Sequence, residues 1–298
     1  MSISIQLSVY NCIEKIYENA CVINNGSDIS KAFNNFFIKS SNSSSNVNTH
    51  TDFISIASSI FLEPTSADEL SKIIQSLNNT KSVGYDDIPT WLIKRCVLII
   101  SPVLSHIINL SLTEGSFPEK LKISIVKPLH KRGDRMQMEN YRPITIIPIL
   151  SEIFEKAMLR RLMNFADKFN IFTPNQHGFR KGSSTTLAIF KLIKTSIEAL
   201  SNTEHIASLY LDMSKAFDLV HHDKLLTKLY KYGIRGSAWD WCKSYLENRR
   251  QCTETMNMLW SRLIACRSDY KLNSTGVPQG SILGPIMFLL YINDLPNL

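Results

Sequence analysis

The chain has 298 residues, of which 44% are hydrophobic and 20% charged, which is enough apolar material for one large globular domain or two small ones. Its formal net charge is +7, which suits a polyanionic partner without requiring one. The six cysteines form no close pairs, which excludes a compact zinc module and a secreted disulfide framework and indicates a reducing compartment. The N-terminus lacks a basic start and a continuous apolar core, so we expect an intracellular protein of the nucleus or cytoplasm that is not secreted.

The basic residues gather in one segment. Residues 120–181 contain thirteen Lys or Arg and five Asp or Glu, a local excess of eight that exceeds the surplus of the whole chain. A positive field concentrated in this way favours a surface that handles phosphates over a general contribution to solubility.

Residues 1–60 are expected to be poorly ordered, with "NNFFIKS" as a short helix and "SSNSSSNVNTH" as a polar linker. A helical region follows at residues 61–117. Its first helix begins at Ser66, which stands three residues before Glu69 in the spacing of a capping box.

A second helical stretch runs from about residue 90 to residue 113. Its apolar part, residues 96–112, contains a proline, a histidine and an asparagine, so we interpret it as a core helix and not as a membrane span. The residues expected on its core face are Ile100, Val103, Leu104, Ile107 and Ile108.

Residues 118–298 begin with an alternating strand, "LKISIVKPLHK", and the polar loop "RGDRMQMENYRPI". In the next helix the residues expected to point inward are Leu150, Ile153, Phe154, Ala157 and Met158, and those expected to point outward are Lys156, Arg160 and Arg161. After the loop "TPNQHGFRKGSS", a further helix is predicted to place on its core face Ile189, Leu192, Ile193 and Ile197.

The last third of the chain mixes strands and helices. "HIASLYLD" at 205–212 is predicted as a strand, and the next helix stops at Gly233, as a C-terminal glycine cap requires. "AWDWCKSYLENRR" forms another helix, in which Trp239, Trp241 and Tyr245 are expected to be core residues. Residues 251–275 fit a hairpin without clean alternation, and "GVPQGSILGP" leads into the apolar helix "IMFLLYIND". Clustered helices with separate strands favour an α+β fold.

Two loops could carry chemistry. Asp212 ends an apolar strand, where a carboxylate could hold Mg²⁺, but many acids at strand ends only support a turn. Gln279 stands between Pro278 and Gly280 in a stiff backbone that a planar group could approach closely, although the same residues suit an ordinary turn before a helix.

A basic hairpin could grip a triphosphate. Lys127, Lys131, Arg132 and Arg142 surround the first strand and its loop, and Lys and Arg bind phosphate oxygens well. The alternative is a solvated basic face.

Five ordered blocks together resemble the reverse transcriptase of non-LTR (LINE-like) retrotransposons, particularly the jockey-like type. They are "VKPLHKRGDRMQMENYRPITIIPILSEIFEK", "NQHGFRKGSSTTLA", "LDMSKAFD", "KLYKYGIRGSAWDWCKSYLENRRQ" and "GVPQGSILGPIMFLLYINDL", and the resemblance runs from about residue 60 to the C-terminus. It implies a right-hand polymerase fold with fingers and part of a palm in residues 118–298, and an RNA-directed DNA polymerase that adds dNTPs by two-metal catalysis.

The resemblance also implies roles for individual residues. Asp212 matches the first metal-binding aspartate, with the carbonyl of Met213 beside it, and Mg²⁺ as the cofactor. Phe217 matches the bulky residue that lies under the sugar and excludes a 2′-hydroxyl, which disfavours an RNA polymerase. Asp218 is expected to support the turn.

Other matched residues surround the incoming nucleotide. Gln279 and Gly280 match the loop that packs against it, and Lys127 and Arg142 match residues that contact its triphosphate. The residues expected near the template strand are Gln176, Gly178 and Arg180. The implied partners are an RNA template, a DNA primer and dNTPs, with no membrane.

The sequence departs from the family pattern in two places. The connection between "NRRQ" and "GVPQG" is longer than usual, and the chain ends at "YINDLPNL", before the block with two adjacent aspartates and before the thumb. We therefore expect a truncated polymerase that does not extend a primer alone. The alternative is a non-catalytic relic that acts at most as a basic nucleic-acid-binding module.

Overall fold

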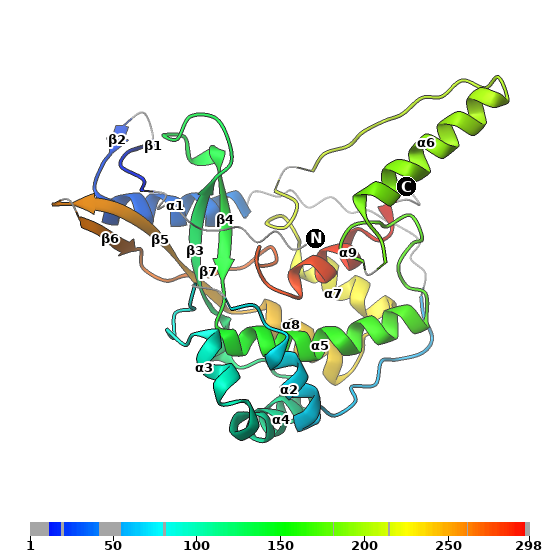
Figure 1. Cartoon of the computed structure of the whole chain (residues 1–298), viewed down its shortest axis with the longest axis horizontal. Helices are drawn as coiled ribbons and strands as arrows, with labels where there is room; N and C mark the ends of the chain where they lie inside the picture. Colours follow the sequence, from blue (N-terminus) through cyan, green and yellow to red (C-terminus); the bar gives the residue numbers. More distant parts are fainter. Residues whose placement is uncertain are drawn as a thin grey trace.

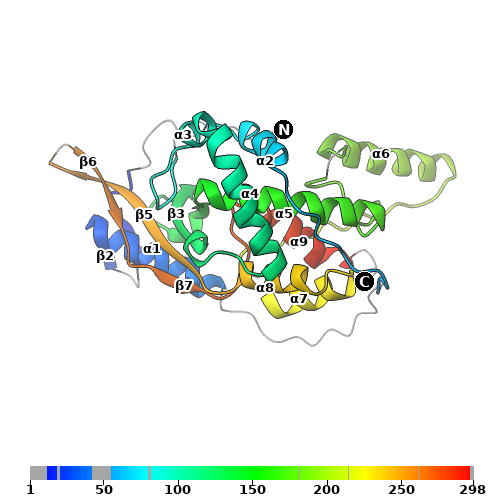
Figure 2. The same cartoon turned by 90° about the horizontal axis from the view of Figure 1, so that it is seen from below.

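The computed structural model describes residues 12–18, 21–41, 55–79, 82–180, 182–213, 215–260 and 262–295. A sheet covered by one helix lies at one end of the molecule and a body of helices at the other, as both views show (Figures 1 and 2). This mixture confirms the α+β class. From residue 42 onward, the predicted polar linker falls outside the described residues.

The main sheet has the strand order β4–β3–β5–β6, with β7 paired to β5. The predicted alternating strand is β3 (Ile123–His130), which pairs antiparallel with β4 (Tyr141–Ile146) and parallel with β5 (Arg249–Leu259). Two further strands, β6 (Arg262–Arg267) and β7 (Lys271–Asn273), run antiparallel to β5. The ambiguous segment before "GVPQG" is therefore a hairpin.

Strand β4 includes residues that the sequence predicts to lie in a loop. Pro143 breaks the sequence signal of the strand, because proline cannot donate to a ladder of hydrogen bonds. It is tolerated here because β4 is the edge strand, with Pro143 opposite Pro128 in the register.

Helix α1 (Gly26–Ser41) packs against the sheet and is longer than the short helix predicted. Phe33 and Phe37 are buried with Val126 and Tyr141 in a small second core. Two short paired strands, β1 (Ile16–Glu18) and β2 (Cys21–Ile23), precede the helix. Part of the first sixty residues is thus folded, while the boundaries of the three predicted regions stay a prediction.

The helical body encloses the main core. Its elements are α2 (Ala67–Gln75), α3 (Thr90–Arg95), α4 (Val97–Glu114), η1 (Glu119–Lys122), α5 (Ile149–Lys168), α7 (His222–Lys231), α8 (Ser237–Leu246) and α9 (Gly284–Ile292), and a second 3-10 turn, η2 (Met138–Asn140), precedes β4. The ring of Phe117 meets those of Trp241 and Tyr245 edge-on, with 5.2 Å between centroids in each pair. Trp241 and Tyr245 are fully buried, as predicted, and Trp239 is partly buried.

Two sequence signals for the ends of helices are confirmed. The Ser66 side chain accepts a hydrogen bond from the Glu69 amide at 3.1 Å, which caps α2. Helix α7 ends one residue before Tyr232, and Gly233 follows with φ +89°, the left-handed conformation that a C-terminal glycine provides.

The long apolar stretch differs from the prediction in two ways. It is two helices, α3 and α4, that meet at Cys96. Val103 and Ile107, which were expected in the core, are 56% and 41% exposed. The buried residues of α4 are Val97, Ser101, Leu104, Ile108, Ser111 and Leu112. Within the described residues, α4 is long and apolar enough to span a membrane by length and composition, so its interpretation as a core helix stays a prediction.

Helix α5 has the predicted inward face, but Arg161 does not point outward. Ile153, Phe154 and Ala157 are buried as expected. The Arg161 guanidinium is also buried and forms an ion pair with Glu69 of α2 at 3.0 Å. The helical period predicted the side of α5 but not a partner from a distant segment.

Two predictions fail between residues 185 and 213. Helix α6 (Thr185–Ser201) extends away from the body (Figure 1), and its predicted core face is exposed, including Ile189 and Ile197. Residues 205–212 are extended but form no strand, and Tyr210 is 77% exposed. A strand needs hydrogen-bonding neighbours, and none of the described strands lies beside this segment.

Candidate functional site

The metal-binding residues implied by the sequence lie in the extended segment before α7. Asp212 and Met213 are exposed, and the Asp212 carboxylate makes no hydrogen bond or ion pair with any described residue. In the described ranges, no group of three or more His, Cys, Asp or Glu side chains could hold a metal ion. One carboxylate and one backbone carbonyl do not make a two-metal centre, so these residues alone do not fit the cofactor.

Backbone hydrogen bonds join the turn after Asp212 to the loop before α9. The Val277 amide donates to the Phe217 carbonyl at 2.9 Å, and the Gly276 amide donates to the Val220 carbonyl at 2.8 Å. Phe217 and Asp218 are thereby held beside the loop that contains Gln279.

The Gln279 side chain meets Asp218. Gln279 Nε2 donates to Asp218 Oδ1 at 3.0 Å, and both residues line a small cavity with Thr145 and Thr275. Burial raises the pKa of the Asp218 carboxyl, while the hydrogen bond from Gln279 and the charge of Lys215 lower it. Asp218 thus orients Gln279, which gives the expected turn-supporting residue a specific partner.

Gly280 is required by a close approach of backbone to backbone. The Thr145 amide donates to the Gln279 carbonyl at 2.7 Å, so the loop lies along the edge of β4. Gly280 has φ +130°, and a Cβ atom there would lie 2.3 Å from the Thr145 carbonyl oxygen. The planar group that approaches this glycine is therefore the peptide of Thr145.

Phe217 belongs to a cluster of three rings. It stacks on Phe288 of α9, with 4.9 Å between centroids and 24° between planes, and Phe179 meets it edge-on at 6.2 Å. Phe179 lies in the loop "NQHGFR", so this loop is a neighbour of the Phe217 turn.

The residues implied for the template lie in that same loop. Gln176 Nε2 donates to the Gly178 carbonyl at 3.1 Å, and Arg180 donates to the Thr173 carbonyl at 3.3 Å. The Arg180 guanidinium also lies 5.3 Å from the ring centroid of Phe172. These contacts are local and shape the loop.

Lys127 and Arg142 share one face of the β3–β4 hairpin. Lys127 is paired with Ile144 and Arg142 with Leu129, and paired residues of antiparallel strands point to the same face. The Lys127 ammonium forms an ion pair with Glu254 of β5 at 2.8 Å. Val126 and Thr145, which line the Gln279 cavity, belong to the alternate positions and the opposite face.

Several cations of the basic segment are already paired inside the protein. Lys122 is 2% exposed and contacts Glu119, and Arg161 is buried against Glu69. The exposed cations of this segment include Lys131, Arg132, Arg135, Arg142, Arg160 and Lys168. The accessible positive surface is therefore smaller than the residue count suggests.

Sequence reasoning missed Glu155, which lies at the centre of the polar contacts behind the Gln279 loop. This carboxylate is fully buried and accepts hydrogen bonds from the Ile282 and Leu283 amides at 2.7 and 3.1 Å. Burial raises the pKa of Glu155, while the charge of Arg249 and the two amides lower it. A signal existed, because Glu155 stands three residues before the buried Met158 and so shares its helical face.

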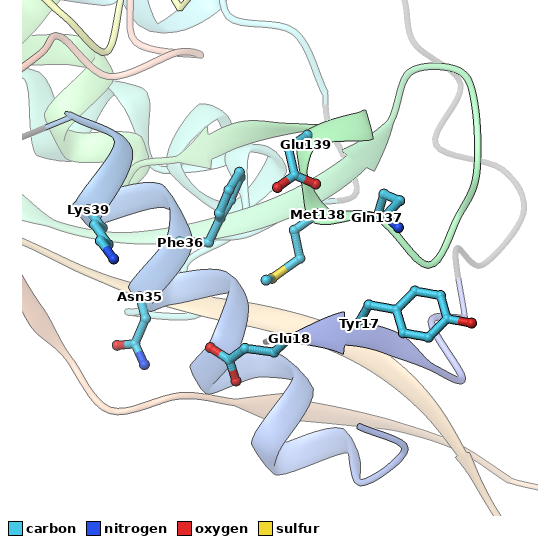
Figure 3. A pocket seen from close by; sticks show the side chains of 8 residues that line it. All are labelled: Tyr17, Glu18, Asn35, Phe36, Lys39, Gln137, Met138 and Glu139. Atoms are coloured by element: carbon cyan, nitrogen blue, oxygen red, sulfur yellow. The ribbon is translucent and has the colours of Figure 1, made fainter. Parts of the chain in front are cut away.

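A separate cavity of about 630 Å³ lies between α1, β1 and the η2 turn (Figure 3). Its lining includes Phe36, Met138, Glu18 and Glu139, and Figure 3 shows the ring of Tyr17 pointing away from the other side chains. Predicted site residues are absent from this lining, so this cavity is distinct from the Gln279 site.

Comparison with known proteins gives one consistent result. A family model described as reverse transcriptase (RNA-dependent DNA polymerase) matches residues 129–298. A probable RNA-directed DNA polymerase from transposon BS of Drosophila melanogaster is 31% identical over 245 residues, which cover 80% of this chain and 25% of the relative. The corresponding protein from transposon X-element of the same species is 30% identical over 77% of this chain and 24% of the relative.

The RNA-directed DNA polymerase from mobile element jockey of Drosophila funebris is 28% identical over 79% of this chain and 25% of the relative. This relative agrees with the jockey-like resemblance of the sequence blocks. The chain spans about a quarter of the length of these curated relatives.

Proposed function

Since the chain belongs to the reverse transcriptase family of non-LTR retrotransposons, we propose that it forms the nucleotide-binding side of an RNA-directed DNA polymerase. In this proposal the β3–β4 hairpin belongs to the fingers, and the turn at Phe217 with the loop at Gln279 belongs to the palm. The substrates are an RNA template, a DNA primer and dNTPs inside the cell.

The observation that supports this proposal most directly is the contact between Gln279 and Asp218. It fixes the Gln279 amide beside the turn of Phe217, although Gln279 and Asp218 are 61 positions apart in the chain. Gln279 and Gly280 would then lie against the incoming nucleotide, and Phe217 would lie under its sugar, where the ring leaves no room for a 2′-hydroxyl.

The remaining roles follow from the family. By the family match Lys127 and Arg142 would contact the triphosphate, but here they lie on the hairpin face opposite the Gln279 cavity. For Lys127 this role also requires exchange of Glu254 for a phosphate oxygen. The loop of Gln176, Gly178 and Arg180 would lie near the template, since Phe179 of this loop contacts Phe217.

The family implies a divalent metal, and we propose that it is Mg²⁺ and that Asp212 and the Met213 carbonyl would supply only part of its oxygen ligands, since these two residues alone do not complete the site. When bound, such a metal stabilises negative charge on the reacting phosphate. The protein residues orient the nucleotide: Asp218 holds Gln279, and Phe288 holds the ring of Phe217.

Binding of dNTP in a ternary complex tests this proposal. The 298-residue chain would be assembled on an RNA template with a chain-terminated DNA primer, and the Kd of the template-matched dNTP would be measured. Gln279→Ala should weaken this binding about tenfold, the order of one lost hydrogen bond to a charged or buried group. Gln137→Ala, which removes an exposed amide on the hairpin loop, is the matched control and should have no effect. Equal binding by the wild type and Gln279→Ala would contradict the proposal.

The exposure of Asp212 favours a second candidate, a module that binds nucleic acid without catalysis. Primer extension distinguishes the two candidates. Because the described residues present a single unsupported carboxylate at this position, we expect no extended product from the chain with dNTPs and Mg²⁺. Product that Asp212→Asn abolishes would show that the metal site assembles after all.

A further inference from the structure

Glu155 has four polar contacts and lies entirely inside the protein. Its Oε2 accepts hydrogen bonds from the Ile282 and Leu283 amides at 2.7 and 3.1 Å. Its Oε1 accepts hydrogen bonds from the hydroxyls of Tyr245 at 3.1 Å and Ser151 at 3.5 Å. A buried carboxylate is costly unless its oxygens are hydrogen-bonded. The metal, sugar and phosphate contacts proposed above do not use this group.

The two amides belong to Ile282 and Leu283, the two residues directly before α9. Leu283 is the N-cap of this helix, whose first amides have no partner inside the helix. Ser281 Oγ satisfies the next amide, that of Gly284, at 2.9 Å. The start of α9 is thus capped by Ser281, which lies just before it, and by a carboxylate of α5. Helix α5 begins 135 residues before α9 in the chain.

We infer that Glu155 is a positioning residue, which fixes the loop of residues 279–283 against α5 and thereby places Gln279 in the nucleotide site. Gln279 stands three residues before Ile282, and its carbonyl must meet the Thr145 amide while its side chain meets Asp218. With one end of the loop fixed by Glu155 and the other by Thr145, the intervening backbone has little freedom. The nucleotide part of this inference rests on the proposed function, whereas the positioning of the loop does not.

The test compares three substitutions by amide hydrogen exchange in the 298-residue chain. Glu155→Ala removes both acceptors, so exchange at Ile282, Leu283 and Thr145 should accelerate at least about tenfold, while amides in the middle of α5 and β3 keep their rates. Glu155→Gln keeps an oxygen that can accept hydrogen bonds from both amides, and its NH2 group can donate to the hydroxyls of Tyr245 and Ser151. This variant should therefore preserve the protection of Ile282 and Leu283 from exchange.

Glu152→Ala is the matched control. Glu152 lies one turn earlier on the same helix, and its carboxylate has no hydrogen bond to the loop. This variant should leave the exchange of Ile282 and Leu283 within about twofold of the wild type. If Glu155→Ala fails to fold, Glu155→Asp decides, because it keeps the charge but is one methylene too short to reach both amides.

Binding of the matched dNTP in the ternary complex provides the second measurement. Glu155→Ala should raise the Kd of the dNTP about tenfold with unchanged affinity for the template–primer, and Glu155→Gln should restore it. A wild-type chain that binds no dNTP would overturn the proposed function, and hydrogen exchange would then decide the loop positioning alone. Unchanged exchange at Ile282 and Leu283 in Glu155→Ala, or equal loss in Glu155→Gln, would overturn this inference.

Discussion

At the scale of single residues, close contacts hold the loop that contains Gln279 and Gly280. Gln279 is held by its carbonyl on Thr145 and by its side chain on Asp218, and Gly280 accommodates the Thr145 peptide. The sequence block "VPQGS" predicted a close approach of a planar group to this loop, and the peptide of Thr145 makes that approach. The block could not identify Thr145 or Asp218 as partners, because both lie more than sixty residues away.

A Gly280→Ala substitution should destabilise the protein by about 2–3 kcal/mol, since φ +130° is strained for alanine and its Cβ would collide with the Thr145 carbonyl oxygen. Gly236→Ala is the matched control, because Gly236 also has positive φ but faces open space. We expect a cost of only about 1 kcal/mol there. Urea denaturation measures both, and equal losses would show that the contact with Thr145 is unimportant.

A Phe217→Ala substitution should reduce the preference for a matched dNTP over the corresponding rNTP. The ring would no longer occupy the space of a 2′-hydroxyl, so the ratio of the two Kd values in the ternary complex should fall at least about tenfold. Phe288→Ala removes the stacking partner without opening that space and controls for loss of packing. Unchanged sugar preference in Phe217→Ala would refute the assigned role.

At the scale of elements, the successes and failures of prediction have one physical explanation. The Ser66 cap, the Gly233 helix end and the existence of strand β3 depend on neighbours in sequence, and all three are confirmed. The strand at 205–212, the core face of α6 and the outward position of Arg161 depend on distant partners, and all three predictions are wrong. Periodicity shows which residues share a face but not what covers that face.

Glu152 of α5 should make the stability of the protein depend on pH. Burial, and next the charge of Glu155, raise the pKa of Glu152 from 4.5 to about 7. Between these values the folded state binds more protons than the unfolded state, so this contribution is present below pH 4.5 and is lost as the pH rises through 7. Glu152→Gln should therefore stabilise the protein at pH 8, by on the order of 1–3 kcal/mol, and have no effect near pH 4. A pH-independent effect in urea denaturation would contradict this assignment.

At the scale of the whole molecule, the sheet adjoins a helical body (Figure 1), and the basic segment 120–181 contributes β3 and β4 to the first and α5 to the second. The local charge excess could be counted from sequence. The ion pairs that remove Lys127 and Arg161 from the accessible charge required the structure.

Binding of an RNA–DNA duplex should weaken as the salt concentration rises. Each phosphate contact should contribute roughly 0.7–0.9 to the slope of the logarithm of the binding constant against the logarithm of the salt concentration. Arg132→Glu should lower the slope by about one such contact, because Arg132 is exposed on the hairpin loop. Lys72→Glu makes the same change of charge on an exposed position of α2 and should leave the slope unchanged. Equal effects of the two variants would show that the basic segment does not line the interface.

Selection of the bound nucleotide by the template base tests the proposed site most directly. The wild-type chain would be assembled with a chain-terminated DNA primer on four RNA templates that differ only at the next base, and the Kd of each dNTP would be measured on each template. We predict that the complementary dNTP binds at least about tenfold more tightly than the other three on every template, because the Gln279 loop and the Phe217 turn hold the nucleotide only where it pairs. Equal affinity for all four dNTPs, or binding that ignores the template, would contradict the assignment of this site.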